Sequence, residues 1–137
     1  MNKVLLIDDD PVFVLLARKI LETIDDTLLI DVFADGELAI NYINTVKDDP
    51  DALPEFIFLD LNMPVLDGWG FLEAYSAIWD KLDKNISLYI LSSTISSDDI
   101  ARALAYPVTK GFLIKPLDKA KMEAILQNED GKDPAKN

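Results

Sequence analysis

Residues 4–10 read Val-Leu-Leu-Ile-Asp-Asp-Asp, an apolar run that stops abruptly at three carboxylates. The pattern recurs along the chain, where Asp60, Ser92 and Lys115 each follow directly on an apolar run of three or four residues. Short apolar runs rich in Val, Ile, Leu and aromatic residues are typical of strands buried on both faces of a parallel sheet. Because ligands bind outside the carboxyl ends of such strands, we predict that these polar residues share one pocket.

Amphipathic segments with apolar residues at helical spacing separate these runs. They predict one further strand over residues 28–33 and five helices over residues 11–24, 38–46, 71–82, 96–104 and 117–127. Asp10 before Pro11 is expected to cap the first helix, and Asp67 to be a loop or cap residue rather than a ligand. Pro107 is expected to end the fourth helix, and Gly111 to lead into the last strand. Because strand and helix alternate five times, the pattern favours an α/β fold with a parallel sheet.

Composition narrows the possible functions. The chain has 137 residues, enough for one domain with a substantial core, and 50% of them are hydrophobic. Its 25 acidic and 13 basic residues give a net charge of −12, which disfavours direct binding to the phosphates of nucleic acids. Because cysteine and histidine are both absent, a metal site would need oxygen ligands. The apolar run at residues 4–7 is too short for the core of a signal peptide, and no run approaches about 20 apolar residues, so we expect a cytoplasmic protein without membrane insertion.

The expected pocket contains the groups that phosphoryl transfer to an aspartate requires. Mg²⁺ prefers octahedral oxygen coordination by one or two carboxylates, water and phosphate, and Asp8, Asp9 and Asp60 would supply the carboxylates. Lys115 and Ser92 would contact the oxygens of the transferring phosphoryl group. One carboxylate is then free to act as a nucleophile and form an aspartyl phosphate.

Four motifs occur in order along the chain: Leu-Ile-Asp-Asp-Asp at residues 6–10, Phe-Leu-Asp-Leu-Asn-Met-Pro-Val-Leu-Asp-Gly at 58–68, Ile-Leu-Ser-Ser at 90–93, and Gly-Phe-Leu-Ile-Lys-Pro at 111–116. Together they resemble the receiver domains of bacterial two-component response regulators, in particular stand-alone receivers. The resemblance covers about residues 3–127, so we expect a receiver domain over residues 1–127 and a polar tail over residues 128–137.

The resemblance implies a flavodoxin-like fold, with a doubly wound five-stranded parallel sheet of order 2-1-3-4-5 and helices on both faces. It implies that Asp60 is the phosphoacceptor, and that a sensor histidine kinase or a histidine phosphotransfer protein donates the phosphoryl group from a phosphohistidine. The implied ligands of the Mg²⁺ cofactor are Asp8, Asp9, Asp60 and the backbone carbonyl of Asn62. Such a protein signals by phosphorylation-dependent protein binding, and it is not an enzyme beyond its own phosphorylation and dephosphorylation.

Three further positions correspond to functional positions of the family. Ser92 matches the switch hydroxyl that moves to the phosphoryl group, and Lys115 matches the lysine that forms an ion pair with that group. Phe112 matches the aromatic switch position. The bond between Lys115 and Pro116 is expected to be cis. Serine stands at 92 where threonine is common, and phenylalanine at 112 where tyrosine is common, so the ring can swing but cannot form a hydrogen bond.

Two other functions fit parts of the sequence. A haloacid-dehalogenase-type phosphatase would use an Asp-x-Asp-x-Val motif, which residues 8–12 match, but the acidic motif at Asp60 precedes the serine and lysine motifs instead of following them. A pseudo-receiver would keep the fold without being phosphorylated, although every pocket residue is present. Trp69 and Trp79 are interpreted as packing residues, with Trp69 close enough to the active loop to report on its environment.

Overall fold

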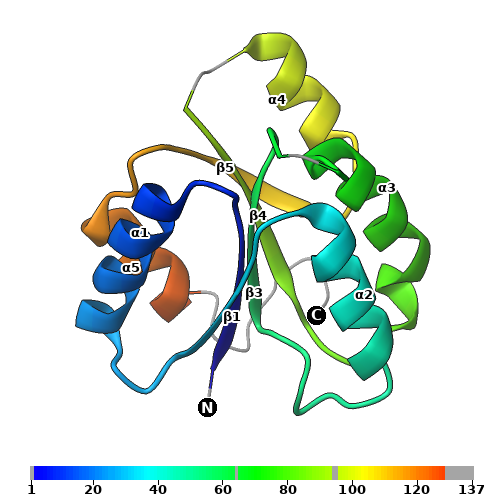
Figure 1. Cartoon of the computed structure of the whole chain (residues 1–137), viewed down its shortest axis with the longest axis horizontal. Helices are drawn as coiled ribbons and strands as arrows, with labels where there is room; N and C mark the ends of the chain where they lie inside the picture. The colour runs from blue at the N-terminus through cyan, green and yellow to red at the C-terminus, as the bar shows by residue number, and fades with distance from the viewer. Residues whose placement is uncertain (1, 64, 94–95, 129–137) are drawn as a thin grey trace.

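The computed structural model describes residues 2–63, 65–93 and 96–128. Within them, five parallel strands form one sheet in the order β2-β1-β3-β4-β5 (Figure 1), which confirms the expected fold and strand order. The strands are β1 (Lys3–Ile7), β2 (Leu29–Phe33), β3 (Phe56–Asp60), β4 (Ser87–Ser92) and β5 (Thr109–Ile114). The helices are α1 (Pro11–Ile24), α2 (Gly36–Val46), α3 (Gly68–Ile78), the short 3₁₀ helix η1 (Trp79–Lys81), α4 (Ser97–Leu104) and α5 (Lys119–Asn128). None of these helices is long and apolar enough to span a lipid bilayer.

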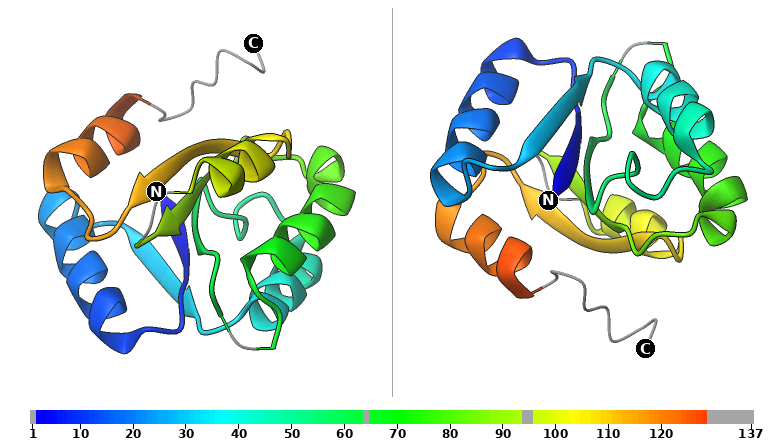
Figure 2. Two further views of the ribbon diagram at one scale, coloured as in Figure 1. Left: turned by 90° about the horizontal axis from the view of Figure 1, so that it is seen from above. Right: turned by 90° about the horizontal axis from the view of Figure 1, so that it is seen from below.

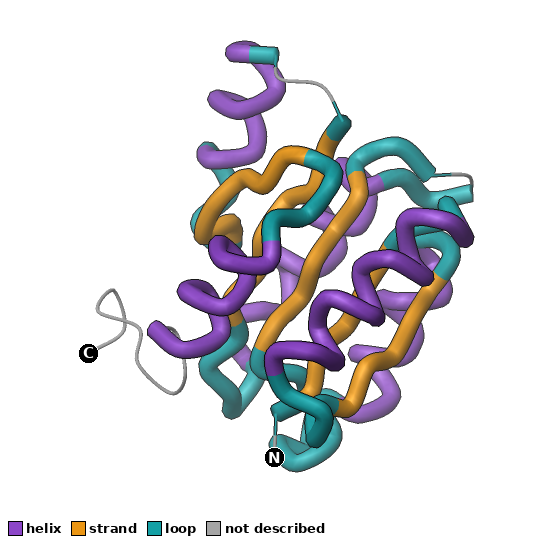
Figure 3. Tube along the Cα trace, turned by 90° about the vertical axis from the view of Figure 1, so that its left-hand side faces the viewer, coloured by secondary structure: helices purple, strands orange, loops and turns teal. Residues whose placement is uncertain are grey.

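Helices cover both faces of the sheet. α1 and α5 lie on one face and α2 and α3 on the other (Figure 2), and the side view shows the strands between the two layers (Figure 3). Successive residues of a strand point to opposite faces, so Leu5 and Ile7 pack in the cluster under α2 and α3, whereas Val4 and Leu6 pack under α1 and α5. All four side chains are fully buried. This two-sided burial explains why the run in β1 is continuously apolar.

Side-chain caps mark the starts of α1 and α3, where the sequence predicts them. Asp10 accepts hydrogen bonds from the N–H groups of Val12 (3.0 Å) and Phe13 (3.4 Å) at the start of α1. Asp67 accepts one from Gly70 at the start of α3, at 2.9 Å. Such caps satisfy N–H groups that have no partner inside the helix. The predictions that Asp10 and Asp67 act as caps are therefore confirmed.

Several element boundaries differ from the predicted ones. β5 begins at Thr109, so Gly111 lies inside the strand, next to a shift in its pairing with β4. α3 ends at Ile78 and is followed by the separate turn η1, and α5 begins at Lys119 instead of residue 117. Of the predicted polar tail, residues 129–137 lie outside the described part of the chain.

Candidate functional site

Four strand ends bring the predicted site residues to one edge of the sheet. Asp8 follows β1, and its N–H donates to the carbonyl of Phe33 (3.0 Å). Asp60 is the last residue of β3, and Ser92 is the last of β4. Lys115 follows β5, and its N–H donates to the carbonyl of Ser92 (2.9 Å). Because the strands are parallel, these residues lie at the same carboxyl-terminal edge.

Three carboxylates converge at this edge. Asp8, Asp9 and Asp60 each place a carboxylate oxygen within 4.8 Å of the other two. Asp8 and Asp60 are only 1% and 5% exposed, whereas Asp9 is exposed to solvent. The N–H of Asp10 donates to Asp8 Oδ1 at 2.9 Å and orients that carboxylate. The fold therefore brings together the acidic residues that the sequence singles out.

The Lys115 ammonium contacts both buried carboxylates. Its Nζ lies 2.7 Å from Asp8 Oδ2 and 3.5 Å from Asp60 Oδ1. It also lies 4.3 Å from the ring centroid of Phe13 on α1, a distance typical of a cation–π contact. The bond between Lys115 and Pro116 is cis, as expected. One ammonium compensates one of three carboxylates, so the cluster retains a negative surplus that favours a further cation.

The surroundings of Asp60 shift its protonation equilibrium. Burial raises the pKa of Asp60 most, and the negative charge of Asp8 raises it further. The Lys115 ammonium and the N–H of Asn62, which donates to the Asp60 carboxylate, lower this pKa. The net result is a pKa of about 6, so Asp60 is largely anionic at neutral pH even before a cation binds.

The loop between β3 and α3 is anchored on both sides. The N–H of Gly68 donates to the carbonyl of Leu61 (3.0 Å), and the N–H of Gly36 on α2 donates to the carbonyl of Leu66 (2.8 Å). Between these anchors, Val65 has a φ of +65°, which is rare for a β-branched residue. These two hydrogen bonds therefore tie the described residues at the ends of the loop to each other and to α2.

Ser92, Phe112 and Asn62 lie close to this edge or beneath it. Ser92 is 4% exposed and comes directly after the residue of β4 that pairs with Asp60. Phe112 is partly buried and packs against the core cluster under α2 and α3. Asn62 is exposed, two residues after Asp60. The roles of Ser92 and Phe112 in switching and of the Asn62 carbonyl in metal binding stay predictions.

The structure also contains a hollow that the sequence pattern does not predict. Its volume is about 350 Å³, and its lining residues are Asp10, Val12, Phe13, Leu16, Ser93, Lys115 and Pro116. Val12 and Leu16 are 65% and 51% exposed. They lie outside the inward-facing stripe of α1, which comprises Phe13, Ala17 and Leu21. A second apolar stripe on one helix is the signal that could have indicated a contact surface here.

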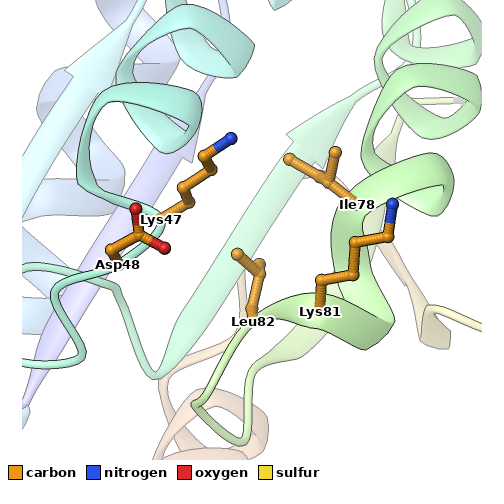
Figure 4. A pocket seen from close by; sticks show the side chains of 5 residues that line it. All are labelled: Lys47, Asp48, Ile78, Lys81 and Leu82. Atoms are coloured by element: carbon orange, nitrogen blue, oxygen red, sulfur yellow. The ribbon is translucent and has the colours of Figure 1, made fainter.

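Figure 4 shows a second pocket of the structure. It has a volume of about 220 Å³, and its lining residues are Lys47, Asp48, Ile78, Lys81 and Leu82. These residues follow α2 or lie at the end of α3 and around η1. Because those segments lead into the amino-terminal ends of β3 and β4, the pocket lies at the opposite edge of the sheet. It contains none of the predicted site residues.

Comparison with known proteins identifies the family. A family model for the response regulator receiver domain matches residues 4–127. The chain belongs to this family. It is 30% identical to the probable methanogenesis regulatory protein FilR2 of Methanothrix harundinacea, over 83% of this chain and 72% of that protein. It is 29% identical to the transcriptional regulatory protein PrrA of Mycobacterium leprae, over 89% of this chain but only 47% of that protein. A two component response regulator from Cytophaga hutchinsonii is similar in structure, with a TM-score of 0.85 at 25% identity over 96% of this chain and 98% of that one.

Membership of the receiver family decides between two of the functions considered from the sequence. Receiver domains belong to two-component signal transduction, not to the haloacid-dehalogenase-type phosphatases. The phosphatase alternative would make Asp8 the nucleophile. In the structure, the Lys115 ammonium lies closer to Asp8 Oδ2 (2.7 Å) than to Asp60 Oδ1 (3.5 Å).

Proposed function

We propose that this receiver accepts a phosphoryl group on Asp60, in a reaction that depends on Mg²⁺. The donor would be the phosphohistidine of a sensor histidine kinase or of a histidine phosphotransfer protein. The observation that carries the proposal is the position of Asp60. It is a buried carboxylate at the end of a central strand, grouped with two further carboxylates and 3.5 Å from the Lys115 ammonium.

The residues at the strand ends fit Mg²⁺. Every side-chain ligand in the acidic group is a carboxylate oxygen, and the three carboxylates are close enough together to contact one ion. Asp8, Asp9 and Asp60 would hold the ion, with the backbone carbonyl of Asn62 as a further protein ligand. When bound, Mg²⁺ supplies a Lewis acid that stabilises negative charge on the phosphoryl oxygens.

Asp60 is the nucleophile in the proposed step. Its carboxylate oxygen forms a bond to phosphorus while the bond from phosphorus to the histidine nitrogen breaks, and the electron pair of that bond stays on the donor imidazole. Lys115 can contact a phosphoryl oxygen with little movement, because its Nζ already lies 3.5 Å from Asp60 Oδ1. The buried hydroxyl of Ser92, at the end of the neighbouring strand, would donate to another phosphoryl oxygen.

The hollow beside Lys115 is the proposed contact surface for the donor protein. A donor must bring its phosphohistidine to Asp60, so it must cover the surface around the strand ends. Val12 and Leu16 on α1 present exposed apolar side chains there, and Pro116 lines the same hollow. Burial of such side chains favours association of the two proteins.

The proposed output is phosphorylation-dependent binding of a partner protein in the cytoplasm. The surface that changes would include α4, β5 and α5. The net charge of −12 supports a protein partner over direct binding to nucleic acid. The activity on Asp60 would be the chain's own phosphorylation and dephosphorylation, without turnover of a separate substrate.

Intact mass spectrometry after incubation with acetyl phosphate tests the proposed function. With Mg²⁺ present, the wild type is expected to gain the mass of one phosphoryl group, and EDTA is expected to prevent the gain. Asp60→Asn removes the nucleophile and is expected to show no adduct. Asp10→Asn is the matched control, because asparagine can still cap α1. An undiminished adduct in Asp60→Asn, or an unmodified wild type as a pseudo-receiver would show, overturns the proposal.

A further inference from the structure

α4 has little buried surface of its own. Among its eight residues, Ala103 is the buried one, and the helix projects beyond its neighbour α3 at the top of the molecule (Figure 1). Two side-chain contacts join this part of the chain to α3. The guanidinium carbon of Arg102 lies 4.0 Å from the ring centroid of Trp69, and the hydroxyl of Tyr106 donates to Glu73 Oε2 at 3.1 Å. α4 is therefore held by Ala103 in the core and by these two side-chain contacts to α3.

Trp69, one partner of the cation–π contact, lies at the start of α3, which packs against β3, the strand that ends in Asp60. Trp69 follows Gly68, whose N–H donates to the carbonyl of Leu61 at 3.0 Å. A Cβ atom on Gly68 would lie 2.6 Å from the carbonyl oxygen of Asp60 and 2.6 Å from Leu61 Cα. The start of α3 thus packs directly on the end of β3, so a movement of the residues around Asp60 also moves Trp69.

Arg102, the other partner, lies on α4, the element that follows β4 in the chain. β4 ends at Ser92, and the next element of the chain is α4, which begins at Ser97. Ser92 lies at the same edge as Asp60, and its carbonyl accepts a hydrogen bond from the N–H of Lys115 at 2.9 Å. Ser92 and the start of α4 are thus near neighbours along the chain, and we expect a shift of Ser92 towards Asp60 to move α4. Trp69 and Arg102 therefore belong to the helices that follow two neighbouring strands, β3 and β4, whose ends line the phosphoacceptor pocket.

We infer that the contact between Trp69 and Arg102 couples the state of Asp60 to the position of α4. The inference rests on the proposed phosphorylation of Asp60 and adds the route by which this chain transmits it. A phosphoryl group that draws Ser92 and Lys115 towards Asp60 changes the distance between the ends of β3 and β4. This change alters the position of Arg102 over the Trp69 ring. α4 then takes a different position on α3 and offers a different surface to a partner protein.

Acrylamide quenching of Trp69 fluorescence tests the coupling. A Trp79→Phe background leaves Trp69 as the single tryptophan of the chain. Phosphorylation with acetyl phosphate and Mg²⁺ is expected to change the quenching constant by about twofold, while intact mass gives the extent of modification. Arg102→Ala is expected to abolish this change, and Arg102→Lys, which keeps a cation, to retain part of it. Arg18→Ala on α1 is the matched control and is expected to respond like the parent.

The possible outcomes separate the coupling from the proposed function. If all variants are phosphorylated and Arg102→Ala shows the full change in quenching, the coupling is wrong and the proposed function stands. If no variant is phosphorylated, the proposed function fails and the coupling fails with it. Hydrogen exchange over residues 97–106 repeats the comparison with both tryptophans in place. Phosphorylation is expected to alter the protection of α4 in the wild type and not in Arg102→Ala, and equal changes in both would overturn the coupling.

Discussion

Asp60 is subject to opposing electrostatic effects at the scale of a single residue. Burial and the neighbouring Asp8 raise its pKa to about 6, whereas Lys115 and the N–H of Asn62 favour the anion. Asp60 must be ionised to act as a nucleophile. Because its surroundings disfavour the anion, ionised Asp60 lowers the stability of the metal-free fold at neutral pH. Clustered buried carboxylates with such a shift are typical of functional sites.

We expect the wild type, without divalent cations, to lose stability relative to Asp60→Asn as the pH rises from about 4 to about 7. The pKa of Asp60 is about 6 in the folded protein against an ordinary 3.8. Between these values the folded state holds a proton that the unfolded state releases. The stabilising contribution is therefore fully present below the lower pKa and is lost as the pH rises through the higher one. The change should be about 1–2 kcal/mol in urea unfolding with EDTA.

Mg²⁺ provides the control for this pH dependence. A cation that binds the folded wild type stabilises it, so addition of Mg²⁺ at neutral pH should remove much of the difference from Asp60→Asn. A difference in stability that stays constant across the pH range would show that burial and Asp8 do not shift the titration of Asp60.

Val65 adds backbone strain in the loop between β3 and α3. It is 77% exposed and has a φ of +65°, a conformation that disfavours β-branched residues. We expect Val65→Gly to stabilise the fold by about 1 kcal/mol, despite the greater entropy of the unfolded chain. Val12→Gly, at a 65% exposed position of α1, should instead destabilise it by about 0.5 kcal/mol. Urea unfolding measures both, and effects of the same sign would argue against strain at Val65.

At the scale of elements, patterns within the sequence were sufficient to predict most strands, the presence of the five helices and two of the helix caps, but most helix starts differ by one to three residues. The apolar run of β1 and the caps Asp10 and Asp67 depend on residues close by in the chain, and the structure agrees with them. The start of β5 did not follow such a pattern. Thr109 lies in a polar segment before Gly111, yet it pairs with Leu88 of β4. Pairing with a neighbouring strand can override the local preference of a segment, and the residues of this segment do not themselves indicate that pairing.

The junction between β3 and α3 depends on the missing side chain at position 68. A Cβ on Gly68 would lie 2.6 Å from the Asp60 carbonyl oxygen and from Leu61 Cα, and neither backbone atom can rotate away. We therefore expect Gly68→Ala to destabilise the fold by about 2 kcal/mol in urea unfolding, although alanine has the higher helix propensity.

Gly70→Ala is the matched control for this junction. A Cβ there would clash with Leu66 Cδ1, the end of a flexible side chain that can move aside. The loss should stay below about 1 kcal/mol, since the gain in helix propensity offsets part of it. Equal losses at the two glycines would mean that α3 is not packed rigidly on β3, and they would weaken the inferred coupling through Trp69 as well.

At the scale of the whole molecule, the topology explains which parts of the site could be predicted. Asp8, Asp60 and Lys115 are predictable neighbours because every strand of a parallel sheet ends at the same edge. The contact of Trp69 with Arg102 and the hollow beside Lys115 depend on how separate helices lie against one another and against the strand ends. Helical periodicity indicates which residues face the core, but not which exposed residues meet across two helices.

The exposed apolar side chains of α1 give a prediction about how the whole molecule meets its donor. Leu16→Lys is expected to slow transfer from a phosphorylated histidine kinase about tenfold, and to slow modification by acetyl phosphate far less, because a small donor need not cover α1. Leu38→Lys is the matched control, since both leucines are 51% exposed but Leu38 lies on α2, on the opposite face of the sheet. The measurement is the initial transfer rate from any kinase that phosphorylates the wild type. If both variants slow it equally, the added charge alone explains the effect and the donor does not bind at the hollow.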